Sequence, residues 1–198
     1  MSNESRILEL ARGNGFIRPR DVEGIGIPRE YLLRLYRKGI VTRIERGLYV
    51  LPGFVKSESF PLAEVSKRAP NAVIGLISAL QFHHLTTQIA HQVWIAIENK
   101  KWKPTFAYPP TRIVYLSGQA FSFGIQEHNI EQVTVKIYNP AKTVADCFKF
   151  RKKIGIDVAL EALKDTLQNR KATVDELWKA AKVCRVTNVI RPYLEALA

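Results

Sequence analysis

The sequence predicts an α+β fold in two domains: a small N-terminal domain of three helices and a β-hairpin, then a mixed α+β domain ending in a helical bundle. Three observations predict this arrangement. Glycines divide the first fifty residues at helix and hairpin lengths, a polar stretch follows at 56–59, and the remainder mixes β-prone runs with helical patterns. Since 198 residues suffice for two cores, we expect domains at 1–56 and 57–198.

The charge of the chain points to a polyanionic partner. Thirty Lys and Arg residues stand against eighteen Asp and Glu, a formal net charge of +12. A basic protein gains affinity for nucleic acid through the release of counterions, and nucleic acid is the commonest partner of this kind.

The composition also bears on the compartment. No signal peptide is recognisable, and no apolar stretch is long enough to span a bilayer, so we expect a cytoplasmic protein without membrane contact. Cys147 and Cys184 are the only cysteines, too few and too far apart for a disulfide scaffold or a zinc finger. We expect both to be reduced thiols.

Three helices are predicted in the N-terminal domain. Ile7, Leu10 and Ala11 recur at helical spacing, and a glycine pair follows them. Pro19 and Pro28 suit first helical turns, and glycines close the two segments that they open. The predicted helices span 5–12, 19–23 and 28–38.

The third helix has two different faces when drawn at 3.6 residues per turn. The side expected to pack carries Tyr31, Leu32, Leu35 and Tyr36. The other side carries Arg29, Glu30, Leu33, Arg34 and Arg37. Guanidinium groups can bind guanine bidentately or bind phosphate, and a leucine can touch a thymine methyl. The alternative is a charged face that only meets solvent.

A hairpin predicted directly after this helix favours the DNA-binding interpretation. The runs 40–44 and 48–51 are β-prone, and the loop 45–47 between them contains Gly47. Helices followed by such a hairpin form a winged helix-turn-helix, in which the hairpin touches the phosphate backbone. The predicted DNA-binding residues are Arg18, Arg20, Arg29, Glu30, Leu33, Arg34, Arg37, Lys38, Arg43 and Arg46.

The chain resembles a known family, the AbiEi-type antitoxins of type IV toxin–antitoxin systems, over nearly its whole length. The resemblance rests on Ile17-x-x-Arg20-x-Val22, Gly26-Ile27-Pro28, Leu32-x-x-Leu35-x-x-x-Gly39, Ile44-x-x-Gly47-Leu48-Tyr49 and the stretch Asn139-Pro140-Ala141-Lys142-Thr143-Val144-Ala145-Asp146. Many winged helices share the earlier motifs, so the last stretch gives the resemblance its weight.

The resemblance implies a transcriptional repressor. It implies that the N-terminal domain binds inverted repeats of double-stranded DNA in its own promoter. It also implies that the second domain opposes a nucleotidyltransferase-like toxin without forming a stable complex. A palindromic operator needs two copies of a winged helix, so we expect a monomer in solution or a dimer on DNA. No cofactor is expected.

In the second domain we expect an apolar stretch over 75–85, strands at 93–97, 112–116 and 133–138, and then helices. Asn139 and Pro140 suit the start of one helix. Leu160, Leu163 and Leu167 line another. A capping box from Thr173 predicts a third. These helices form the expected closing bundle.

Basic clusters occur in the second domain too. Lys100, Lys101 and Lys103 surround a tryptophan, which suggests an additional polyanion contact or else a charged loop. The run 151–153 at a helix end is better explained by compensation of the helix dipole.

No catalytic constellation is recognisable, so we expect no enzyme. Glu98-Asn99-Lys100 after a strand supplies part of a metal-dependent nuclease site, but only Glu58 and Glu64 could supply its upstream acid. The four histidines, His83, His84, His91 and His128, lack a carboxylate at ligand spacing, and we expect structural roles and no metal. The alternatives to a repressor are a winged-helix module for protein or RNA and, less favoured, such a nuclease.

Overall fold

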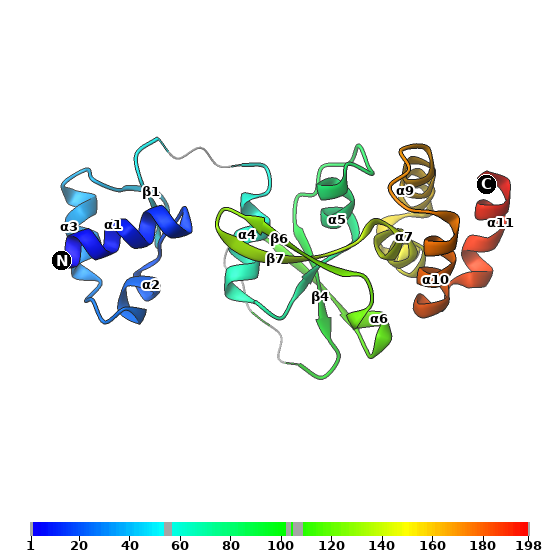
Figure 1. Ribbon diagram of the computed structural model, residues 1–198, viewed down its shortest axis with the longest axis horizontal. Coiled ribbons are helices and arrows are strands. Elements are labelled where there is room, and N and C mark those ends of the chain that lie inside the picture. Colours follow the sequence, from blue (N-terminus) through cyan, green and yellow to red (C-terminus); the bar gives the residue numbers. More distant parts are fainter. Residues whose placement is uncertain (1, 54–56, 102–103, 105–108, 198) are drawn as a thin grey trace. The chain divides into compact units, whose positions relative to one another are not determined.

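The structure is a computed structural model that describes residues 2–53, 57–101, 104 and 109–197. The chain forms two compact units, one from residues 1–60 and 129–133, the other from 61–128 and 134–198 (Figure 1). Helices and a mixed sheet make the fold α+β, as predicted. Within the described ranges, no helix combines the length and the apolar character that crossing a membrane requires.

The N-terminal unit contains three helices followed by a two-stranded antiparallel hairpin. Ser2 caps the first helix, because its Oγ accepts a hydrogen bond from the backbone N–H of Ser5 at 3.1 Å. The second helix starts with Pro19, and the backbone N–H of Arg18 donates to Oδ2 of Asp21 at 2.9 Å. The elements are α1 (Asn3–Asn14), α2 (Pro19–Gly24), α3 (Glu30–Arg37), β1 (Thr42–Glu45) and β2 (Leu48–Val50).

Apolar residues from these elements share one core. Leu32 and Leu35 of α3 are buried with Ile7 and Ala11 of α1. The core also contains Ile17, Val22, Ile27, Val41 and Tyr49. The hairpin is fixed to this core, because the backbone N–H of Ile17 and that of Tyr49 each donate to the carbonyl of the other at 2.9 Å.

The second unit contains a five-stranded sheet and eight helices among its described residues. Its strands are β3 (Val73–Ile74), β4 (Val93–Glu98), β5 (Thr111–Leu116), β6 (Ile125–Ile130) and β7 (Val133–Tyr138). Its helices are α4 (Phe60–Arg68), α5 (Leu76–His83), α6 (Gln119–Ser122), α7 (Pro140–Lys149), α8 (Arg151–Ile154), α9 (Ile156–Gln168), α10 (Val174–Cys184) and α11 (Thr187–Leu197).

The strand order in this sheet is β5-β4-β3-β7-β6. The central strand, β3, pairs antiparallel with β4, where Val73 lies opposite Ala96, and parallel with β7, where Ile74 lies opposite Ile137. It has only two residues, whereas β4 and β7 have six each. The sheet is therefore mixed, and its middle is much shorter than the strands on either side.

One face of the sheet and the C-terminal helices form the main core of this unit. Trp94 and Ala96 of β4 and Val114 and Leu116 of β5 pack with buried residues of α5, α7, α9, α10 and α11. Alternation along β4 sends Val93, Ile95 and Ile97 to the opposite face, and these are buried as well. The expected closing bundle of helices thus shares its core with the sheet.

The predicted helix starts in this unit are confirmed. Oδ1 of Asn139 accepts a hydrogen bond from the backbone N–H of Lys142 at 2.9 Å, with Pro140 as the first residue of α7. At α10, Oγ1 of Thr173 accepts from the backbone N–H of Glu176 at 3.2 Å, and Oε2 of Glu176 accepts from that of Thr173 at 2.7 Å.

An ion pair lies inside the core, on α7. Nζ of Lys142 donates to Oδ2 of Asp146, and the two side chains are 0% and 2% exposed. Oδ1 of Asp146 accepts from Sγ of Cys184 at 3.3 Å, and Nζ of Lys142 lies 4.1 Å from the ring centre of Tyr138. Burial raises the pKa of Asp146 against the opposing effect of Lys142, and it raises the pKa of Cys184 to about 12.

Three elements of the second unit, β3, α6 and β6, are not predicted from the sequence. β3 has two residues, α6 has four, and β6 has the mostly polar sequence IQEHNI. The apolar stretch expected over 75–85 contains a helix, α5, which begins after the extended Gly75. Apolar runs of this length fit a buried helix as well as a strand.

We expect Asp146→Ala to destabilise the second unit by about 3–5 kcal/mol, because it leaves the Lys142 ammonium buried without its carboxylate. The double variant Lys142→Met/Asp146→Leu removes both charges. Its free energy of unfolding should lie within about 1 kcal/mol of the wild-type value or above it. Urea denaturation measures both. Equal losses in the two variants would contradict this account of the pair.

His83 should make stability depend on pH. Burial lowers the pKa of His83 from 6.5, and the charges of His128, Lys171 and His84 lower it further, against a hydrogen bond between its Nε2 and the carbonyl of Tyr138. The unfolded state then binds the proton more readily than the folded state. The contribution of neutral His83 to the free energy of unfolding is therefore complete above pH 6.5 and is lost as the pH falls below that value. Urea midpoints between pH 7.5 and 5.5 should fall less in His83→Gln than in the wild type or in His91→Gln, a control at an exposed histidine.

Candidate nucleic-acid interface

The rotation of α3 about its axis is set by two leucines. Leu32 and Leu35 are buried in the core of the N-terminal unit, three residues apart on one side of the helix. The helix begins at Glu30, two residues later than predicted, and the backbone N–H of Tyr31 donates to the carbonyl of Pro28 at 3.1 Å. All other residues of α3 are exposed except Tyr31, which is half-buried.

The end of α3 depends on a left-handed glycine. Gly39 has φ +71°. Its backbone N–H donates to the carbonyl of Tyr36, and that of Ile40 donates to the carbonyl of Leu35, both at 3.0 Å. This pattern satisfies the last carbonyls of a helix and turns the chain sharply. It sends the backbone from α3 directly into β1.

The exposed side of α3 carries the residues that the sequence analysis places there. Leu33 is 37% exposed. The guanidinium carbon of Arg34 lies 5.0 Å from the ring centre of Tyr31, and Arg29 lies 3.7 Å from Glu30 in an exposed ion pair, a contact of small energetic value. Arg37 forms no ion pair with any residue that the structure describes. The surface of α3 is therefore rich in guanidinium groups that water surrounds.

Tyr36 corrects the prediction for the packed side of α3. It is 43% exposed, and its ring lies 5.7 Å from that of Tyr49 in an edge-to-face contact. Its position on the helical wheel and its aromatic character predict burial, but the residue lies at the margin of the core beside the hairpin. Tyr36 thus belongs to the exposed surface, where helical spacing does not place it.

The hairpin presents two arginines. In its register Arg43 lies opposite Tyr49, and a bulge follows between Arg43 and Glu45. Residues opposite each other in a hairpin share a face, so Arg43 lies on the face that carries Tyr49. Nε of Arg43 donates to the carbonyl of Glu45 at 3.2 Å, and Arg46 occupies the turn, exposed, beside Gly47 with φ +74°.

Arg18 and Arg20, although close in sequence, differ in exposure. Arg20 is exposed and lies 3.9 Å from Oδ1 of Asp21. Arg18 is only 9% exposed, because it begins α2 at the edge of the core. Its burial leaves it little surface for a direct contact with DNA, and we leave it out of the interface. Lys38 is exposed and forms an ion pair with Glu4 at 2.8 Å.

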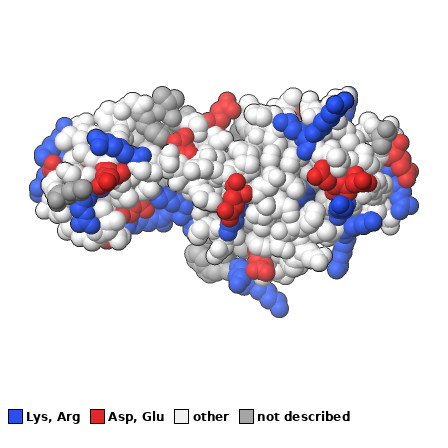
Figure 2. All heavy atoms as spheres, in the orientation of Figure 1, with Lys and Arg blue, Asp and Glu red and all other residues white. Residues whose placement is uncertain are grey.

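Seven of the eight basic residues predicted for this surface are exposed. They are Arg20, Arg29, Arg34, Arg37, Lys38, Arg43 and Arg46. Figure 2 shows Lys and Arg atoms around the unit that contains α1–α3, with acidic side chains between some of them. The surface therefore has cations on both α3 and the hairpin.

The predicted lysine cluster of the second unit is described in part. Lys100 and Lys101 are exposed in the turn after β4, and Lys100 has φ +68°. Lys103 lies outside the described residues. Two of the three lysines are thus available to a ligand.

Glu64, one of the two candidate acids of the nuclease alternative, is enclosed in the fold. Glu64 is fully buried, and its Oε1 accepts a hydrogen bond from Arg68 at 3.0 Å. A carboxylate held in this way is a poor metal ligand. In the ranges that the structure describes, no three His, Cys, Asp or Glu side chains gather in a group that could hold a metal ion.

Comparisons with known proteins bear on the N-terminal unit first. Residues 5–52 match the family described as transcriptional regulator, AbiEi antitoxin. The resemblance to AbiEi regulators is confirmed over this segment. It contains α2, α3, β1, β2 and all of α1 except its first two residues, and with them every candidate DNA-binding residue of the first unit.

The whole chain also resembles a solved structure. The crystal structure of the RV2827C protein from Mycobacterium tuberculosis matches with a TM-score of 0.61 over 98% of this chain and 80% of that one, at 14% sequence identity. At this identity the match shows a shared fold and nothing about activity. Among curated proteins, none matches the chain.

The glycine at the end of α3 gives a test of this geometry. A Cβ at Gly39 would meet no atom within 4 Å, so Gly39→Ala should not create a clash. It should lower the free energy of unfolding by about 1–2 kcal/mol, because alanine is strained in the left-handed backbone conformation. Gly13→Ala is the matched control, because Gly13 lies inside α1 with equally open space and should be neutral or stabilising by up to about 1 kcal/mol. Thermal unfolding measures the difference, and equal effects would contradict the account.

Proposed function

We propose that the N-terminal unit is a winged helix-turn-helix that binds double-stranded DNA, with α3 in the major groove and the β1–β2 hairpin as the wing. The match of residues 5–52 to AbiEi transcriptional regulators carries this proposal. It is supported by the burial of Leu32 and Leu35, which leaves the arginines of α3 facing water.

The residues of this surface have different roles in the proposal. Arg29, directly before α3, and Arg34 and Arg37 of α3 can each donate two hydrogen bonds to O6 and N7 of a guanine. Glu30 can accept a hydrogen bond from a cytosine amine, and Leu33 can contact a thymine methyl. The remaining cations, Arg20, Lys38, Arg43 and Arg46, bind phosphates and add affinity without sequence preference.

We further propose that the protein represses its own promoter as the antitoxin of a type IV toxin–antitoxin operon. A palindromic operator would be read by two copies of the chain, each on one half-site about 34–36 Å from the other. In this proposal the second unit counteracts a nucleotidyltransferase-like toxin without a stable complex, and the protein has no enzymatic activity. Lys100 and Lys101 offer the second unit an additional contact with a polyanion.

The arginines of α3 test the DNA-binding mechanism. Alanine at Arg29, Arg34 or Arg37 should cost about 1–3 kcal/mol for the operator and relax the preference for one base pair. Alanine at Arg46 should weaken all duplexes alike and lower the salt slope of binding by about 1. Fluorescence anisotropy with the DNA upstream of the gene, at several salt concentrations, measures both effects.

Arg191→Ala provides the control for these variants, because Arg191 is an exposed arginine of α11 in the other unit. Its operator affinity should equal that of the wild type. If the triple change Arg29→Ala/Arg34→Ala/Arg37→Ala also binds the operator like the wild type, the proposed interface is wrong. The winged helix would then be better explained as a module for protein or RNA.

The antitoxin role has a separate test. We expect a nucleotidyltransferase-like reading frame beside this gene, and its product should arrest growth when it is expressed alone. Co-expression of the full chain should restore growth. Continued arrest, with both proteins present at equal amounts, would contradict the antitoxin role without bearing on DNA binding.

A further inference from the structure

A pocket in the second unit lies where the central strand of the sheet ends. β3 has two residues, and the residues before it, 68–72, line the pocket together with Ile97 and Glu98 of β4 and Lys136 of β7. The pocket has a volume of about 630 Å³, within the range of sites that hold small organic ligands. None of its residues belongs to the proposed DNA-binding surface of the first unit.

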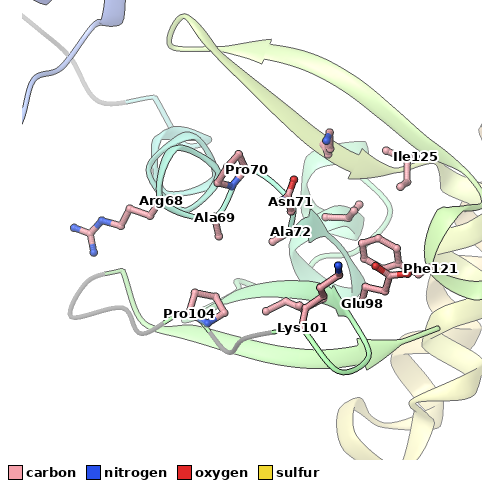
Figure 3. A pocket seen from close by; sticks show the side chains of 13 residues that line it. Arg68, Ala69, Pro70, Asn71, Ala72, Glu98, Lys101, Pro104, Phe121 and Ile125 are labelled. Carbon is pink, nitrogen blue, oxygen red and sulfur yellow. The ribbon is translucent and has the colours of Figure 1, made fainter. Parts of the chain in front are cut away.

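The charged groups of this pocket are mostly cationic. Lys101 lies after β4, and Lys136 lies on β7, an interior strand of the sheet. Neither lysine is within ion-pair distance of a carboxylate in the described parts of the chain. Arg68 also lines the pocket but is paired with Glu64 at 3.0 Å. Figure 3 shows Lys101 pointing into the pocket and Arg68 pointing away from it. The two lysines are therefore free to bind an anionic group.

The rest of the lining is apolar, with two polar groups among it. Phe121 and Ile125, which are half-buried, supply most of the apolar surface, with a small part from Ile97, and Pro70 and Pro104 flank it. Such a surface fits a flat ring. Glu98 and Asn71 are the polar groups, and a carboxylate and an amide can bind the amino-bearing edge of a base.

We propose that this pocket binds a nucleoside monophosphate whose base carries an exocyclic amine. Lys101 and Lys136 bind the phosphate, the apolar side chains contact the base, and Glu98 accepts a hydrogen bond from the amine. A phosphate and an amino-bearing base are present both in a free mononucleotide and in each such nucleotide of a single-stranded nucleic acid. This inference gives Lys101, proposed above for a polyanion contact, a defined ligand, and it does not depend on DNA binding by the first unit.

Isothermal titration calorimetry of the full chain tests the proposal with AMP, CMP, UMP, adenosine and inorganic phosphate. We expect AMP or CMP to bind at least tenfold more tightly than UMP, adenosine or phosphate. A single-stranded pentanucleotide distinguishes the two sources, because tighter binding than the monophosphate indicates that the site takes nucleic acid. No binding of any monophosphate below about 5 mM would overturn the proposal. Equal binding of UMP would overturn the role given to Glu98.

Two variants link the binding to this pocket. Lys101→Gln and Lys136→Gln should each weaken the monophosphate about tenfold, because each removes one charge-assisted hydrogen bond. Lys152→Gln, at an exposed lysine of α8 outside the pocket, should bind like the wild type. Thermal unfolding checks that Lys136→Gln is folded. If Lys136→Gln does not fold, the affinity of Lys101→Gln, a change in an exposed turn, tests the proposal alone. Wild-type affinity in Lys101→Gln would overturn the proposal.

Discussion

The burial of two leucines decides what the N-terminal unit can present to a partner. Leu32 and Leu35 are fully enclosed by the core that α1, α2 and the hairpin complete. Since each residue of a helix is rotated by about 100° from the last, fixing these two side chains fixes every other residue of α3. Moving this apolar pair by one position would turn arginines towards the core and remove them from any groove.

The second unit obeys a different constraint, the length of its central strand. β3 brings β4 and β7 into one sheet, but it has only two residues against six in each of these strands. The buried pair of Lys142 and Asp146 lies within α7, and Sγ of Cys184 on α10 donates a hydrogen bond to the same carboxylate. The pocket and the α3 surface therefore arise from separate features of the chain, and each can be altered without the other.

Much of this structure follows from local rules that a sequence displays. Asn139 and Thr173 start helices where capping chemistry predicts them, and Gly39 ends α3 because a left-handed turn is needed there. Other features depend on partners distant in sequence. β3 exists only through pairing with β4 and β7, and the mostly polar β6 lacks the alternation that marks a strand. The burial of Arg18 and the exposure of Tyr36 likewise depend on how α2, α3 and β2 meet, which spacing alone does not encode.

Methylation protection of the operator shows whether arginines of α3 bind base edges in the major groove. Dimethyl sulfate attacks N7 of guanine, the atom that a bound guanidinium covers. We expect the wild-type protein to protect specific guanines in each half-site, and we expect these guanines to become reactive again with Arg34→Ala or Arg37→Ala at saturating concentration. Full reactivity of every guanine N7 beneath a tightly bound wild-type protein would contradict this binding mode.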